Sequence, residues 1–377
     1  MTIAAFIFGI LLIIGILQDS FETIILPRRV SRRFRLSRLF YITLWGLWSM
    51  PARKMRQGNR REFYLSYFGP LSLILLLVVW AFVLVFGFAL LQWGIGSQVV
   101  APEKIPDFGT DFYLSGTTFI TLGLGDVIPH NGLPRFLTVT EAGMGFAFLA
   151  LVIGYVPVIY QAFSRREINI SLMDARAGSP STPMEMLRRH CRNENTTELV
   201  QFLREWEKWC AELLESHLSY PVLTYYRSQH ERQSWLASLT TILDVCALVM
   251  VGLNDVPIKP AKFVFAIARH AAVDLAQVYG TPPVLTTKRL SKSDFARLRN
   301  ELAANSIFLH DGEDVEKKLA ELRGMYEPFV EALSTHLLMP LPGWLPEPGR
   351  VDDWETSAWD HFLESTPRTL DRAIRRE

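Results

Sequence analysis

The chain has 377 residues, enough for two or three domains, and 49% of them are hydrophobic. Its net charge of +1 is unevenly spread, because residues 28–61 hold 11 basic and no acidic side chains. The remainder carries 28 basic against 38 acidic residues, and the long apolar runs lie within the first 166 residues. Cys191, Cys210 and Cys246 lack the spacing of metal ligands, which argues against a cysteine metal site and indicates reduced thiols.

Residues 2–26 are predicted to form a first membrane helix. The run is apolar, and it has neither the basic start nor the small-residue cleavage site of a signal peptide. Asp19 and Glu22 near its end leave open a second interpretation, an interfacial or partly buried helix.

The basic block at residues 28–61 marks the cytoplasmic side of the membrane and favours contact with anionic lipid headgroups. Its position beside apolar spans argues against nucleic-acid binding. Between its two halves, residues 39–50 are rich in aromatic side chains but too short to span, which predicts an amphipathic helix at the interface.

Two further spans are predicted, on either side of a short helix. Residues 63–102 contain no charged side chain, and their centre, residues 71–91, is the second span. Residues 97–109 are expected to form an extracellular turret. Glu103, Asp107 and Asp111 at this mouth either attract cations weakly or are ordinary solvated charges. Residues 112–120 are too short to span, and residues 133–163 form the third span, which ends at two arginines.

Between these spans lies the stretch Thr117–Pro129, with the sequence TTFITLGLGDVIP. It resembles the pore loop of the potassium-channel superfamily, in which a Thr-rich pore helix precedes Thr-Val-Gly-Tyr-Gly-Asp. The segment around it is similar to the bacterial two-transmembrane pore domain, here with an extra N-terminal helix. Such a filter replaces the water shell of the ion with backbone carbonyls, and alternate residues need unusual dihedral angles that glycine adopts easily.

The resemblance implies an all-α membrane protein with a tetrameric potassium-channel-like pore domain: an outer helix, a re-entrant pore helix with its filter, and an inner helix. Potassium would bind the carbonyls of Thr121, Leu122, Gly123 and Leu124, and Gly125 would shape the outer turn. Two residues differ from the usual filter, since Leu122 and Leu124 replace Val and Tyr. Leu124 removes an aromatic brace, so a weakly selective cation channel remains the alternative to a potassium-selective one.

The resemblance also suggests residues that support the filter and bend the inner helix. Filter support is expected from Thr117, Thr118, Asp126 and Glu141. Glu141 either stands in for a carboxylate behind the filter or is exposed at the outer interface. The inner helix contains Gly145, Gly154 and Pro157, which act either as a gating hinge or, for the glycines, as close-packing positions.

The charge distribution predicts a multi-pass protein of the cell (inner) membrane, with its N terminus outside and its C terminus in the cytoplasm. The expected segments are a transmembrane helix at 1–27, a basic segment at 28–62, the pore domain at 63–166 and a cytoplasmic regulatory domain at 167–377. One filter per chain implies a homotetramer. We expect no cofactor, potassium as the permeant ion, and an unidentified cytoplasmic ligand.

The soluble half is predicted to be helical. A linker at Gly178–Ser181 precedes a capping box at Thr182–Glu185, and residues 199–217 carry an apolar stripe. Residues 235–253 are long enough to span, but Asp244 in their middle favours a buried helix. Residues 262–279, 293–304 and 315–338 complete the helices.

Residues 217–230 form a polar and aromatic joint, interpreted as a packed corner in preference to a ligand pocket. His310-Asp311 is similar to the metal-binding pair of helical phosphohydrolases, but the other histidines follow no ligand pattern. The protein is therefore not expected to be an enzyme, although a membrane-anchored helical sensor or enzyme with a vestigial pore stays open as an alternative.

Overall fold

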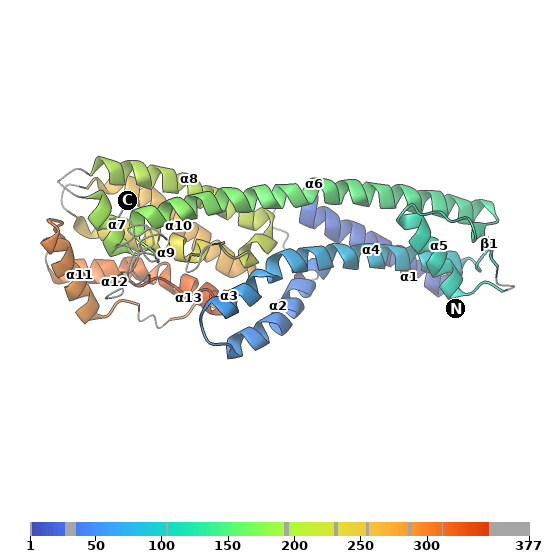
Figure 1. Ribbon diagram of the computed structural model, residues 1–377, viewed down its shortest axis with the longest axis horizontal. Helices are drawn as coiled ribbons and strands as arrows, with labels where there is room; N and C mark the ends of the chain where they lie inside the picture. The colour runs from blue at the N-terminus through green and yellow to red at the C-terminus, as the bar shows by residue number, and fades with distance from the viewer. Residues whose placement is uncertain are drawn as a thin grey trace, which may run out of the picture. The chain divides into compact units, whose positions relative to one another are not determined.

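The described part of the protein is mostly helical (Figure 1). The computed structural model describes residues 2–26, 35–102, 105–191, 196–229, 233–253, 256–285, 289–310 and 312–346. The chain divides into two compact units. The first contains Met1–Phe163 and Leu218–Tyr226, and the second contains Ser164–His217 and Arg227–Glu377.

Helices long and apolar enough to cross a membrane occupy residues 3–25, 59–94, 132–177 and 235–252 of the described chain. The first unit holds the first two and most of the third. Its elements are α1 (Thr2–Ser20), a π-helical turn η1 (Phe21–Ile25), α2 (Leu36–Lys54), α3 (Asn59–Ser66), α4 (Phe68–Gly94), α5 (Phe108–Phe119) and the first part of α6 (Gly132–Ala177).

The two helices α1 and α4 lie side by side (Figure 1) and approach closely through glycines. A Cβ atom on Gly9 would lie 2.7 Å from the carbonyl oxygen of Gly87, and one on Gly94 would lie 2.7 Å from the Cβ of Phe6. Small residues allow such close packing of helix backbones in a bilayer. The sequence predicted a first membrane helix, and the structure packs it along the second one.

The acidic residues near the end of α1 are satisfied by polar partners. Asp19 is buried and accepts hydrogen bonds from the Ser37 backbone N–H at 3.1 Å, the Ser37 hydroxyl at 3.0 Å and the Trp80 indole N–H at 3.0 Å. Arg35 lies 3.6 Å from Glu22. A buried carboxylate is tolerated when it is hydrogen-bonded and paired, so these acids do not conflict with a membrane helix. Asp19 and Glu22 also compensate the charge of Arg35, which belongs to the basic block. Four other members of that block, Arg28, Arg29, Arg32 and Arg33, fall outside the described residues.

The helix predicted over residues 39–50 is present as α2, which starts three residues earlier and ends four residues later than expected. Its Trp45 ring packs against Phe68 of α4 at a centroid distance of 4.8 Å and against Tyr225 at 5.0 Å. Tyr225 belongs to a short 3-10 helix, η3 (Pro221–Tyr225), within the returning segment Leu218–Tyr226. The sequence placed that segment in the cytoplasmic domain, whereas the structure makes it part of the first unit.

The second unit contains the end of α6 and seven further helices in the described chain. These are α7 (Pro183–His190), α8 (Thr197–Ser219, the last two residues of which belong to the first unit), α9 (Trp235–Gly252), α10 (Ile258–Val278), α11 (Lys292–Ala304), α12 (Glu313–Gly324) and α13 (Glu327–Leu337). We expected one helix over residues 315–338, but the backbone breaks after Gly324, and α13 begins at Glu327 with Pro328 in its first turn.

Helix α9 is the centre of the second unit (Figure 1), in contact with α7, α10, α12 and α13. Of its most apolar 18-residue window, 94% is buried inside the protein. Asp244 is fully buried and binds Arg289 at 2.5 Å and the Tyr326 hydroxyl at 2.5 Å. Although burial lowers the pKa of Arg289, the Asp244 charge raises it above its ordinary value. Because Asp244 is paired with Arg289 and other helices cover almost all of α9, this helix is better explained as a core helix than as a fourth membrane span.

The residues preceding α7 are more ordered than a linker. Ser179 donates a hydrogen bond to Asp174 at 2.5 Å, and both Ser179 and Ser181 are buried. The Thr182 hydroxyl accepts from the Glu185 N–H, as the capping box requires, but the Glu185 side chain turns instead to Arg188 and Arg189. These ion pairs lower the pKa of Glu185 despite the opposing effect of burial.

Candidate ion-conducting site

A short, half-buried helix leads directly into the glycine-rich turn. Helix α5 begins four residues earlier than predicted because Asp107 caps it, accepting a hydrogen bond from the Thr110 N–H at 3.0 Å. Its outer face packs on α4 through aromatic rings, including Phe112 against Phe82 at 5.9 Å. Helix α5 ends at Phe119, so its C-terminal carbonyls, which attract cations through the helix dipole, lie next to the turn.

The turn after α5 has an alternating backbone conformation. Thr121, Gly123 and Gly125 have positive φ angles of 58°, 55° and 77°. Left-handed backbone at every second residue lets successive carbonyls point the same way, the geometry that a carbonyl filter needs. Gly123 and Gly125 adopt these angles without strain, whereas Thr121 does so at a cost, as is common at functional sites. Unusual dihedral angles were predicted for the two glycines, but left-handed backbone at Thr121 was not.

The inner end of this turn is tied to α5. The carbonyl oxygen of Thr117 accepts hydrogen bonds from the N–H groups of Leu122, at 2.8 Å, and Gly123, at 3.3 Å. The Thr117 hydroxyl donates back to the Tyr113 carbonyl at 3.0 Å, and Thr118 is buried. Thr117 therefore fixes the start of the turn mainly through its main chain.

The outer end of the turn is held by Tyr113. Its hydroxyl, one helical turn before Thr117, donates to the Asp126 carboxylate at 2.9 Å. Just after the turn, β2 (Ile128–Pro129) pairs antiparallel with β1 (Val99–Val100), which lies near the start of the loop between α4 and α5. The candidate filter thus has a side-chain brace although Leu124 lacks a phenol. A tyrosine thirteen residues before the aspartate was the signal in the sequence.

Behind α5, three helices bring together buried polar side chains. Glu141 of α6 is fully buried beside Ser115 of α5, so the expected alternative of an exposed Glu141 is wrong. Gln92 of α4 donates to Thr138 of α6 at 3.2 Å. Asp111 was expected at the surface of the mouth, but it is fully buried and accepts from the Ser97 hydroxyl at 2.6 Å. Glu103 and Lys104 of that loop fall outside the described residues.

The inner helix α6 runs unbroken past Gly145, Gly154 and Pro157. A Cβ atom on Gly145 would lie 2.0 Å from the carbonyl oxygen of Phe119, the last residue of α5. This glycine therefore lets the pore helix end rest on α6. A Cβ atom added to Gly154 would have no described atom within 4 Å, so nothing in the described part of this chain requires its small size for packing.

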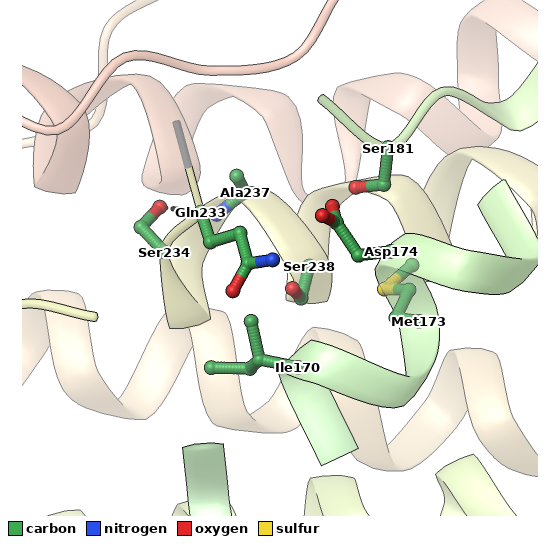
Figure 2. Close-up of a pocket in the computed structure, with 8 residues that line it drawn as sticks. All are labelled: Ile170, Met173, Asp174, Ser181, Gln233, Ser234, Ala237 and Ser238. Carbon is green, nitrogen blue, oxygen red and sulfur yellow. Dashed lines mark hydrogen bonds between the residues drawn. The ribbon is translucent and has the colours of Figure 1, made fainter. Parts of the chain in front are cut away.

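The second unit contains polar cavities. Figure 2 shows one of about 10 Å³, lined by Asp174, Ser181, Gln233, Ser234 and Ser238 together with apolar neighbours. That volume suits a single water molecule and no metabolite. A wider groove of about 410 Å³ is lined by Ala175 and Arg176 at the end of α6 and by residues of α7 and α8. Among the described residues, no group of His, Cys, Asp and Glu side chains is arranged to hold a metal ion.

Comparison with known proteins finds a family match over the same helices and turn. Residues 73–161 match the family described as "Ion channel". These residues form an ion-channel domain. It is of the two-transmembrane, potassium-channel-like type, as the resemblance of the pore loop predicted. The match runs from α4 through α5 and the turn to α6, so it contains every candidate filter residue.

One curated relative adds support for a membrane protein. YdjJ of Bacillus subtilis (strain 168), an uncharacterised membrane protein, is 23% identical over 206 residues, which cover 52% of this chain and 60% of the relative. The chain thus spans less than two thirds of that relative. No solved structure matches the chain.

Proposed function

We propose that the protein is a potassium-selective channel that conducts passively across the cell membrane. Potassium binds the carbonyls of Thr121, Leu122, Gly123 and Leu124, and Gly125 shapes the outer turn. The observation that carries this proposal is the positive φ at residues 121, 123 and 125, directly after a short, half-buried helix and between two candidate spans. It gives the ion-channel domain a backbone that can supply ordered rings of carbonyl oxygens.

The conducting unit is a homotetramer. One chain provides a single filter strand, whereas a ring of carbonyls around an ion needs four. Residues 120–126 are exposed in the single chain, including the apolar Leu122 at 55% and Leu124 at 62%. Apolar side chains at these positions are better accommodated against other copies than in water.

Selectivity for potassium depends on how firmly the filter is held. Tyr113 and Asp126 brace its outer end, Thr117 and Thr118 its inner end, and Glu141 supports α5 from behind. Leu124 adds no hydrogen bond, so a weakly selective cation channel is the second candidate. The inner helix α6 bends at Gly154 and Pro157 to open or close the inner gate, whereas Gly145 allows the end of α5 to pack closely on α6.

The rest of the chain regulates and anchors this pore. We place the N terminus outside and the C terminus in the cytoplasm of the inner membrane, with the exposed basic residues Arg38, Arg53, Lys54, Arg56 and Arg60 near anionic headgroups. The cytoplasmic half has no catalytic role and gates the inner helices. Its unidentified ligand binds the groove at Ala175 and Arg176, where the last turn of α6 forms one wall.

Reconstitution tests the proposal. Purified protein in liposomes should carry potassium down its gradient and discriminate against sodium. Gly123→Ala should abolish flux, because a side chain at φ of 55° is strained, while tetramers persist. Gly15→Ala, on α1 with no described atom within 4 Å of the added group, is the matched control and should conduct normally. Equal potassium flux through both variants would refute the filter assignment.

A further inference from the structure

The segment Leu218–Tyr226 is the part of the first unit that comes from far along the sequence. It begins with the last two residues of α8 and ends before α9, and both helices otherwise belong to the second unit, yet it packs with the ion-channel helices. Val222, Leu223 and Tyr225 are 3%, 1% and 5% exposed, so the 3-10 helix η3 is as buried as a core element. A connection between two helices normally lies on the surface, and burial of this one requires an explanation.

The segment fills the space between the outer and inner helices. Val222 and Leu223 form one apolar cluster with Leu73 of α4 and with Tyr155, Ile159 and Phe163 of α6. Tyr220 lies 5.9 Å from the Tyr155 ring, and Tyr226 lies 5.4 Å from the Phe163 ring. All contacts on α6 lie beyond Gly154 and flank Pro157.

The same segment also contacts the start of α4 and the interfacial helix α2. The Tyr225 ring lies 5.0 Å from Phe68 and 6.0 Å from Tyr41, on which it is stacked. Gly69 approaches Tyr226 so closely that a Cβ atom there would lie 2.6 Å from the ring. One short turn therefore touches three helices of the pore unit at once.

We infer that Leu218–Tyr226 is a gating wedge, a positioning element that sets where the inner helix lies relative to the outer helix beyond Pro157. The inference rests on the proposed channel function. A bend of α6 at Gly154 and Pro157 moves Ile159 and Phe163, which cannot separate from α4 without displacing Val222 and Leu223. Because the wedge continues into α8 on one side and towards α9 on the other, a rearrangement of these two helices acts on the gate through it.

A double-mutant cycle tests both parts of the inference. Gly69→Ala places a methyl group against the Tyr226 ring, and Tyr226→Ala removes that ring. Thermal unfolding of the purified full-length protein should show strongly non-additive effects, with the double variant relieving part of the damage caused by Gly69→Ala. Additive effects would overturn the packing of the wedge. This readout does not require that the protein conducts ions.

Flux then tests the role in gating. Tyr226→Ala should change potassium flux into liposomes by about fivefold or more, the lower end of typical coupling between linked sites, while the potassium-to-sodium ratio stays constant. Gly46→Ala on α2, with no described atom within 4 Å of the added group, should leave flux unchanged. Unchanged flux in a folded Tyr226→Ala protein would overturn the wedge, whereas absence of flux in the unmodified protein would instead refute the channel proposal.

Discussion

Gly145 offers the sharpest test of how the inner helix supports the filter. In Gly145→Ala, the new methyl carbon would lie 2.0 Å from the carbonyl oxygen of Phe119 and 2.8 Å from its carbon. Ordinary contact begins at 3.4 Å, so the end of α5 or the backbone of α6 must shift by about 1.4 Å. Both atoms belong to backbone, which cannot rotate away as a side chain can.

The expected cost is about 1–3 kcal/mol, as for other overpacked sites. Thr121 follows Phe119 by only two residues, so the displacement acts on the first carbonyls of the filter. If that energy falls on the conducting arrangement, its population drops by about 5–150-fold. We therefore expect Gly145→Ala to reduce potassium flux by that factor, with tetramers still formed.

The control lies on the same helix. Gly143→Ala introduces the same methyl group where no described atom lies within 4 Å, and α-helix propensity favours alanine over glycine equally at both positions. The assay is potassium flux in liposomes at matched protein content, together with thermal unfolding. If the two variants conduct alike, the close approach of α6 to Phe119 does not support the filter, and Gly145 must be explained as a hinge.

Four further experiments probe other parts of the molecule. Tyr113→Phe removes the hydrogen bond to Asp126, which contributes about 0.5–3 kcal/mol, and should lower the potassium-to-sodium permeability ratio; an unchanged ratio would place the brace elsewhere. Cysteines at Gln57, Ile105 and Leu285, all exposed, should be labelled from outside in intact cells only at Ile105, and outside labelling at Leu285 would mean that α9 spans. Burial and, after it, the nearby charge of Arg166 lower the pKa of His217 well below its ordinary value. The contribution of neutral His217 to the free energy of unfolding is therefore complete above a pH of about 6.5, and it falls by up to about 1.4 kcal/mol for each pH unit below that. His217→Gln should reduce the drop in melting temperature between pH 7 and pH 5. Arg289→Met removes the cation that pairs with the fully buried Asp244, while Glu327 keeps its ion pair with Arg323 at 3.0 Å. This change should destabilise the fold by about 3–5 kcal/mol, measured by denaturant unfolding, whereas Arg297→Met, which breaks an exposed pair, should cost under about 1 kcal/mol.

The order of the helices in the pore domain could be predicted from the sequence because their signals are local. A run of apolar residues long enough to span, a short Thr-rich helix and a Gly-x-Gly turn each lie within a few residues of one another. The backbone at Gly123 and Gly125 follows from what glycine permits. Helix α5 starts four residues earlier than predicted because the Thr110 N–H donates a hydrogen bond to the Asp107 carboxylate, which caps the helix.

Contacts between residues far apart in the sequence could not be predicted from local sequence signals. Asp111 and Glu141 look like ordinary acids in the sequence, and only the packing of α4, α5 and α6 shows that both are buried. The partner of Asp244 is Arg289, 45 residues further on, so the sequence could state the cost of a buried carboxylate but not how it is met. Local composition carries no record of such pairings.

The returning segment shows why domain boundaries read from composition can fail. Residues 218–226 contain three tyrosines beside Ser219 and Thr224, and this mixture of aromatic and polar side chains was interpreted as a packed corner of the C-terminal domain. Their burial against Leu73 and Phe163 follows from matching an apolar turn to an apolar crevice between two helices, a match made in three dimensions. Because the chain enters and leaves this crevice within nine residues, a truncation after α6 removes the wedge along with all the helices that follow. Loss of gating in such a truncated protein would therefore not by itself show that a ligand-binding domain had been lost. The point variants at Gly69 and Tyr226 separate the two causes, since they leave the second unit complete.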